Sequence, residues 1–182
     1  TAGSSRMRAM GRHRGLWRGL RWALLALALV ASWHAPAQAA PAQAAPKSPT
    51  FITLDGKKIG PGELRGKLVL VNFWATSCGV CLQEMPDLIA TYRRYRSRGL
   101  EVIAVAMDYD EPALIRAYMA KHRLPFPVVF DRDGALAKEY EGVRATPTTF
   151  LIDPSGKRIS KTVGIIDFDK LRAFLESAAA PG

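Results

Sequence analysis

The sequence predicts an α/β domain in which helices flank a central mixed sheet. Strand-like and helix-like segments alternate through residues 68–73, 81–96 and 100–107, an order typical of parallel strands joined by helices. Later, two strand-like runs, 148–152 and 157–163, are joined by a short turn ahead of a final helix. Because a short turn joins antiparallel strands, the sheet should contain both kinds of pairing.

The composition fits one domain with additional segments. The chain has 182 residues, of which 48% are hydrophobic, enough for a sizeable core. The formal net charge is +10, but residues 1–40 hold six arginines and no acidic residue. Since most of the basic excess lies in that segment, nucleic-acid binding is not predicted.

The N-terminal segment has the pattern of an export signal. Arginines lead into an uncharged apolar run, Trp22 to Trp33, which suits a secretory signal and is short for a membrane-spanning helix. Met7 and Met10 are both candidate starts. We expect residues 1–39 to be a signal peptide or, if uncleaved, a membrane anchor, and residues 40–49, rich in Ala, Pro and Gln, to be an extended tether. Either outcome indicates a periplasmic or other extracytoplasmic location.

The folded domain should cover residues 50–178 and open with a β-hairpin. Two short strand-like runs, Phe51–Leu54 and Lys57–Ile59, flank the turn signal Asp55-Gly56. Gly60-Pro61-Gly62 should then break the regular structure.

A central strand and a long helix should follow the hairpin. Leu68–Phe73 is apolar apart from Asn72, as expected of a strand covered on both faces. Apolar residues then recur at helical spacing through Cys81–Arg96. Pro86 should kink this helix, and Gly99 should end it.

The second half of the domain continues with alternating strands and helices. The expected elements are a strand at 100–107, a helix that Asp110-Glu111-Pro112 caps and that ends near His122, a strand at 128–130, a short helix at 135–140, strands at 148–152 and 157–163, and a helix that Asp167 caps. Thr146-Pro147 lies directly before one of these strands, and the residues alone leave its cis or trans state open.

The two cysteines of the chain indicate thiol–disulfide chemistry. Cys78 and Cys81 form a Cys-x-x-Cys pair between a buried strand and a helix. A structural bridge stabilises a fold by closing a long loop, which this pair does not do. A helix N-terminus favours the thiolate, so Cys78 should be the exposed nucleophile and Cys81, one turn deeper, the resolving thiol.

Two polar side chains near the cysteines have more than one interpretation. Glu84 lies three residues after Cys81, on the same helix face, and is either a buried proton acceptor or an exposed carboxylate. Asn72, in the middle of the strand, should hydrogen-bond within the core rather than act as a base.

The motifs resemble a known family. The run NFWAT-x-C-x-x-C-x-x-E-x-P with a later T-P-T is similar to thioredoxin-like exported reductases of the TlpA, ResA and CcmG type, and the similarity covers Phe51 to Glu176. It implies a thioredoxin fold with an added strand pair at the N-terminus. It also implies an inserted strand–helix segment within Leu100–Phe130.

The resemblance also assigns roles to particular residues. Cys78 and Cys81 would form the redox disulfide, and Glu84 would be the catalytic acid beside them. Asn72 stands where ordinary thioredoxins carry a buried aspartate, so proton handling would shift to Glu84. No cofactor and no metal are implied.

Three further positions match the family's substrate-binding pattern, and two depart from it. Trp74 would shield the site, Pro147 would be a cis-proline facing the cysteines, and the Thr146 backbone would pair with substrate. Ser77 stands where tryptophan is usual, and Val80 where proline is common. These departures should alter the stability of the thiolates, so the direction of electron flow stays open.

The resemblance implies an exported thiol–disulfide oxidoreductase that reduces protein disulfides. Its partners would be protein thiols or disulfides, such as those of apocytochrome c or a copper site, and a membrane thiol-electron donor. The alternative is a Cu(I) metallochaperone that uses both cysteines, but His122 is poorly placed as a third ligand. A peroxidase is disfavoured because Thr76 is too near Cys78.

Overall fold

The computed structural model describes residues 49–178, which lie within one compact unit. The expected signal peptide or anchor at 1–39, and the expected tether up to residue 48, lie outside the described residues. Within 49–178, every helix is too short or too polar to cross a membrane.

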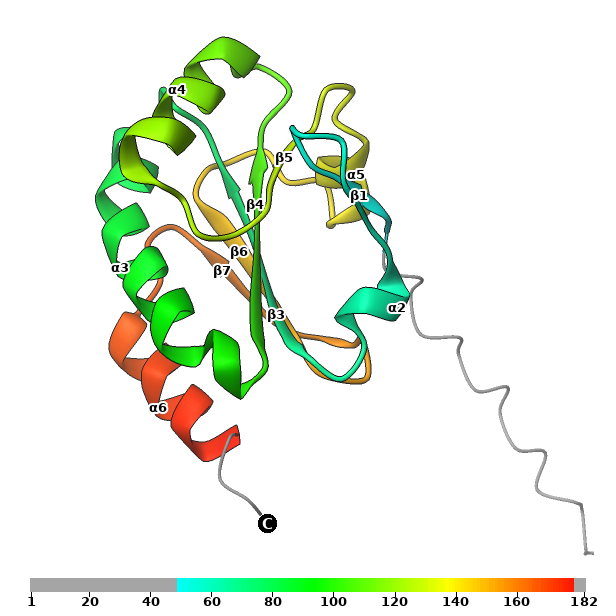
Figure 1. Ribbon diagram of the computed structural model, residues 1–182, viewed down its shortest axis with the longest axis vertical. Helices are drawn as coiled ribbons and strands as arrows, with labels where there is room; N and C mark the ends of the chain where they lie inside the picture. Colours follow the sequence, from blue (N-terminus) through cyan, green and yellow to red (C-terminus); the bar gives the residue numbers. More distant parts are fainter. Residues whose placement is uncertain (1–48, 179–182) are drawn as a thin grey trace, which may run out of the picture. The chain divides into compact units, whose positions relative to one another are not determined.

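A five-stranded mixed sheet forms the centre of the domain (Figure 1), in the strand order β5-β4-β3-β6-β7. In chain order the strands are β3 (Leu68–Trp74), β4 (Leu100–Ala106), β5 (Val128–Phe130), β6 (Thr148–Ile152) and β7 (Arg158–Val163). The β3–β4 and β4–β5 pairs are parallel, whereas β3–β6 and β6–β7 are antiparallel. The predicted mixed sheet is thus confirmed, and all seven residues of its central strand β3 are buried.

Helices cover both faces of this sheet. They are α2 (Pro61–Leu64), α3 (Gly79–Tyr95), the 3-10 turn η1 (Arg96–Arg98), α4 (Pro112–His122), α5 (Ala135–Glu139) and α6 (Phe168–Ala178). Figure 1 shows α3, α4 and α6 on one side of the sheet, and α2, α5 and β1 on the other. The chain leaves η1 through Gly99, whose φ of 90° suits glycine, as expected.

The N-terminal hairpin is a separate two-stranded sheet of β1 (Phe51–Ile52) and β2 (Lys58–Ile59), paired antiparallel. A hydrogen bond joins the hairpin to the main sheet. The Leu54 amide donates to the carbonyl of Val128, the first residue of β5, at 2.9 Å. The predicted hairpin extension is therefore confirmed.

Helix α2 is a correction to the expected structural break at Gly60-Pro61-Gly62. Proline at the first helical position loses no helical hydrogen bond, and its fixed φ suits a helix start. The Glu63 carboxylate accepts from the Gly60 amide at 2.9 Å, which stabilises this first turn.

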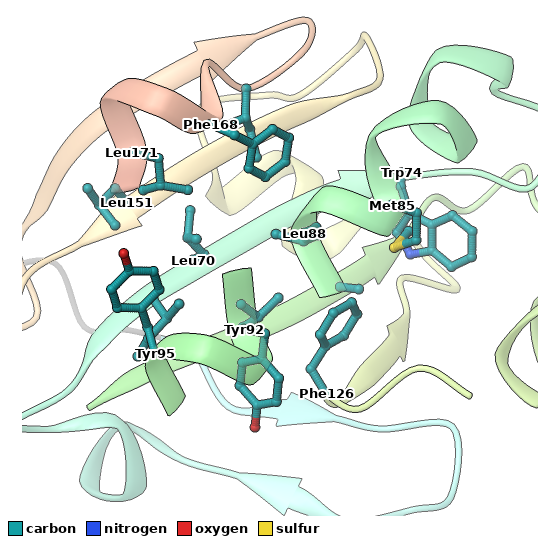
Figure 2. Packing of buried hydrophobic residues seen from close by; sticks show 14 of the residues in the cluster. Leu70, Trp74, Met85, Leu88, Tyr92, Tyr95, Phe126, Leu151, Phe168 and Leu171 are labelled. Atoms are coloured by element: carbon teal, nitrogen blue, oxygen red, sulfur yellow. The ribbon is translucent and has the colours of Figure 1, made fainter. Parts of the chain in front are cut away.

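Two hydrophobic clusters lie on the opposite faces of the sheet. Figure 2 shows part of the cluster on the α3 and α6 side, where Leu88, Phe168 and Leu171 pack around Leu70 of β3. The other cluster packs the alternate residues of β3 against α5 and the hairpin. Because side chains alternate along a strand, Asn72 shares the α3-facing side with Leu70, within the first cluster's face.

Candidate active site

The cysteine pair lies at the N-terminus of α3, just past the end of β3. Cys78 is the residue that caps the helix, and its Sγ accepts from the Cys81 amide at 3.2 Å. The two sulfurs form a disulfide of 2.10 Å, with the Cα atoms 5.2 Å apart. Cys78 is partly exposed, whereas Cys81 has 0% exposure. An incoming thiol or disulfide therefore reaches Cys78 more readily than Cys81.

The Asp110 carboxylate holds the turn before the cysteines. The sequence predicts for Asp110 only a part in capping α4. The Asp110 carboxylate accepts from the Thr76 amide at 2.6 Å and from the Thr76 hydroxyl at 2.5 Å. The N-cap residue of α4 is Glu111, and its side chain makes no capping hydrogen bond. Its place in the loop that follows the buried strand β4 is the sequence signal that Asp110 lies at the edge of the sheet carrying the site.

Glu84 is buried beneath the cysteine-bearing turn of α3, at 3% exposure. Its Oε1 accepts from Asn72 Nδ2 at 2.9 Å, and its Oε2 accepts from the Ile166 amide at 3.1 Å. Burial raises the pKa of Glu84 above its ordinary value, and the two donors offset part of that rise. Glu84 is therefore a buried side chain and not an exposed helix carboxylate. A carboxyl with a raised pKa can exchange a proton nearer neutral pH.

Asn72 links Glu84 to strand β6. Its Nδ2 also donates to Thr149 Oγ1 at 2.9 Å, and Thr149 is the residue paired with Asn72 in the β3–β6 register. The predicted hydrogen bonding of Asn72 within the core is therefore confirmed. Sequence alone could not identify Thr149 or Ile166, because both contacts depend on register and packing across distant parts of the chain.

The Thr146–Pro147 bond is cis, and it lies at the same edge of the sheet as the cysteines. Phe73 pairs with Thr148, which places Pro147 next to the end of β3. The Pro147 carbonyl accepts from the Gly164 amide at 2.8 Å, so the loop after β7 supports this segment. Thr146 is partly exposed, and its hydroxyl lies 3.3 Å from the Tyr109 hydroxyl.

Trp74 is fully buried, whereas the two residues that depart from the family pattern are exposed. Trp74 ends β3 and packs against Tyr118, with ring centroids 5.3 Å apart, and Figure 2 shows it beside Met85. Ser77 is exposed, and Val80 has 42% exposure. A substrate approaching Cys78 would thus meet Ser77 and Val80 before it met Trp74.

Residues 49–178 contain no group of three or more His, Cys, Asp and Glu side chains placed to hold a metal ion. His122, which we considered as a third copper ligand, stacks on Tyr118 with ring centroids 4.1 Å apart.

Comparison with known proteins places the chain in a family. The model of the AhpC/TSA family matches residues 36–159. Thiol-disulfide oxidoreductase ResA of Bacillus thuringiensis subsp. konkukian is 37% identical over 132 residues, which cover 71% of this chain and 75% of that protein. The chain belongs to the AhpC/TSA family, among its ResA-type members. The predicted family resemblance is confirmed.

Solved structures of ResA-type relatives share the fold. A thiol:disulfide interchange protein of the thioredoxin family from Chlorobium tepidum matches with a TM-score of 0.68 and 28% identity, over 78% of this chain and all of that one (100%). StoA from Bacillus subtilis matches with a TM-score of 0.62 and 25% identity, over 72% and 98%. The thioredoxin fold is therefore confirmed, and this ResA-type chain is a thiol–disulfide oxidoreductase.

Proposed function

We propose that the protein reduces disulfides of other proteins outside the cytoplasm by dithiol exchange through Cys78 and Cys81. The observation that carries the proposal is the disulfide at the start of α3, in which one sulfur-bearing residue is accessible and the other is buried. A helix N-terminus stabilises a thiolate on Cys78. This arrangement supports attack by Cys78 and resolution by Cys81.

Each step of the exchange can be assigned to a residue. The Cys78 thiolate attacks one sulfur of the substrate disulfide, which forms a mixed disulfide and releases the first substrate sulfur as a thiolate. Glu84 accepts the proton of the Cys81 thiol, directly or through water. The Cys81 thiolate then attacks Cys78 Sγ, which restores the Cys78–Cys81 disulfide and releases the second substrate thiolate. The substrate gains the two electrons that the cysteine pair loses.

Substrate binding is assigned to the segment beside the cysteines. The Thr146 backbone would pair with an extended substrate strand, while Pro147 would pack near the sulfurs. Support comes from the exposure of Thr146 and from the pairing of Phe73 with Thr148, the residue that follows Pro147. Trp74, which is buried, would act from beneath by supporting the turn rather than by touching substrate.

The segments ahead of the domain support the proposed location, and the family resemblance supports the proposed pathway. Residues 1–39 would export the protein or anchor it through Trp22 to Trp33, and residues 40–49 would tether it. A membrane thiol-electron donor would then reduce the Cys78–Cys81 disulfide after each cycle. The substrate class would be proteins of cytochrome c maturation or respiratory-complex assembly that need reduced cysteines.

An insulin-reduction assay beside a Cu(I) titration tests this proposal. We expect the reduced protein to accelerate insulin precipitation with dithiothreitol, and Cys78→Ser to abolish the effect. Ser77→Ala is the matched control, because it changes the same turn without removing a thiol, and it should retain most turnover. Tight stoichiometric Cu(I) binding without insulin reduction would contradict the proposal and favour the metallochaperone alternative.

A further inference from the structure

The buried amide of Asn72 is the feature of the domain whose chemistry the proposed steps leave unused. Asn72 is the one polar residue of β3 and has 0% exposure. Both hydrogens of its Nδ2 are used, one by Glu84 Oε1 and one by Thr149 Oγ1, each at 2.9 Å. Among the residues that the structure describes, its buried Oδ1 has no hydrogen-bond partner. Such an atom is costly in a core unless the amide serves a purpose.

Of the groups that hydrogen-bond to Glu84, the Asn72 amide is the one that a substitution can remove. The carboxyl has two hydrogen-bond donors, the Asn72 side chain and the Ile166 backbone amide. Only the first can be removed by substitution. Cys78 and Cys81 are the titratable groups on the same helix end, and β3 and β6 contain none. Beyond Ile166, the charged groups Asp167 and Lys170 are exposed and paired with each other at 2.9 Å.

An amide can hydrogen-bond to a carboxyl group in either protonation state. Toward a carboxylate it donates from nitrogen, as Asn72 does here. Toward a carboxylic acid it can accept at oxygen, after a half-turn about its last side-chain bond. The Thr149 hydroxyl has the same capacity, since it can accept from Nδ2 or donate to Oδ1. Both contacts of the amide can therefore survive a change in the charge of Glu84.

We propose that Asn72, supported by Thr149, is a positioning residue that holds Glu84 in place through both halves of its proton exchange with Cys81. The inference rests on the proposed role of Glu84 as proton acceptor. Asn72 itself touches neither substrate nor sulfur in this scheme. It keeps the carboxyl oriented when charged and when neutral, and its donation favours the charged form that accepts the proton.

The first test measures the pH dependence of mixed-disulfide resolution in the full chain. Asn72→Leu removes the donor at similar volume, so the Glu84-dependent midpoint should move up by about 1–2 pH units, the size expected for one hydrogen bond to a charged group. The rate at high pH should stay below that of the wild type, because the ionised Glu84 carboxylate is no longer held in place. Thr149→Val is the matched control, since it removes the other contact of the amide and should shift the midpoint less.

A Glu84→Gln background separates positioning from a general loss of packing. That background lacks the Glu84-dependent midpoint, so adding Asn72→Leu there should leave the remaining pH dependence of the rate unchanged. An unchanged midpoint in the Asn72→Leu single variant would overturn the inference. An equal shift in the Glu84→Gln background would overturn it as well, because the effect would not pass through Glu84.

Nuclear magnetic resonance of the wild-type chain gives a test that needs no variant to fold and no activity. The side-chain ¹⁵N resonance of Asn72 should titrate with the same midpoint as the Glu84 carboxyl carbon. A pH-invariant Asn72 amide beside a titrating Glu84 would contradict the inference. If the protein failed to reduce insulin but the two signals titrated together, the proposed function would fail while the coupling of Asn72 to Glu84 would stand.

Discussion

An acidic side chain lies near each end of helix α3, and the two side chains have opposite environments. At the N-terminal end, Glu84 is buried and accepts only from neutral donors, among them Asn72. At the C-terminal end, Glu176 of α6 is exposed and accepts from Arg94 at 3.0 Å and Arg98 at 2.8 Å. The Tyr95 hydroxyl also donates to Glu176, at 2.6 Å.

The comparison shows how environment gives two carboxyl groups opposite pKa shifts. Burial raises the pKa of Glu84, whereas the Tyr95 hydrogen bond and then Arg98 lower the pKa of Glu176. The stabilising contribution of Glu84 is therefore lost as pH rises above 4.5, its ordinary value, through the folded pKa. The stabilising contribution of Glu176 is present above the pKa of this group in the unfolded chain. It is lost as the pH falls through the lower pKa of the folded state.

The largest effect should come from Cys81→Ser at the reactive end. Without the resolving thiol, the mixed disulfide between Cys78 and substrate cannot collapse. Turnover in the insulin assay should fall to the rate without enzyme, and a covalent complex should be visible by non-reducing electrophoresis. Turnover that survives this substitution would rule out the dithiol mechanism.

Glu84→Gln should have the next largest effect. Loss of a positioned proton acceptor should slow resolution about 10²-fold at neutral pH, measured by stopped-flow release of a labelled substrate thiol. The variant should also lack the decline in thermal stability that we expect of the wild type as pH rises above 4.5. Wild-type kinetics over the whole pH range would remove Glu84 from the mechanism.

Val80→Pro should change the cysteine pair without changing the acid. Val80 lies between the cysteines with 42% exposure, so the substitution alters the turn but no buried contact. We expect the reduction potential to move by roughly tens of millivolts, well within the span of related pairs. Equilibration with glutathione measures this shift, and an unchanged potential would show that Val80 does not tune the pair.

Glu176→Gln should have the smallest effect and should leave turnover unchanged. Its ion pairs are exposed and screened by salt, so the loss of thermal stability at pH 7 should be slight and should vanish in high salt. Glu141→Gln is a control of the same kind, because within residues 49–178 Glu141 pairs with Lys161 alone, at 3.0 Å. A large stability loss specific to Glu176, or any fall in turnover, would contradict the separation of the two ends.

Local sequence patterns predicted most of the helices and strands. The contacts between distant residues depend on the register of the sheet and on packing. The apolar run Leu68–Phe73 was enough to predict the central strand, since both of its faces are covered. The short helix α2 was missed because glycine and proline signal a break as readily as a helix start. The bond between Ile166 and Glu84 was not predictable, because it joins residues 82 positions apart.

The site was predictable to the extent that its residues lie on one element. Cys78 and Cys81 follow from their spacing at the start of α3, whereas the spacing of Glu84 left both a buried and an exposed position open. Asp110, which holds the cysteine turn, and Thr149, which supports Asn72, come from neighbouring strands or the loops that follow them. Their contributions depend on which strands pair, and that arrangement is a property of the whole sheet.

The reduction potential of the Cys78–Cys81 couple, measured against pH in the wild type and in Glu84→Gln, tests the proposed coupling most directly. If Glu84 exchanges its proton with the pair, the wild-type plot should bend at the Glu84 pKa, and the variant plot should lack that bend. Superimposable plots would contradict the coupling. A wild-type potential near −270 mV would support a reductant, and one near −120 mV an oxidant.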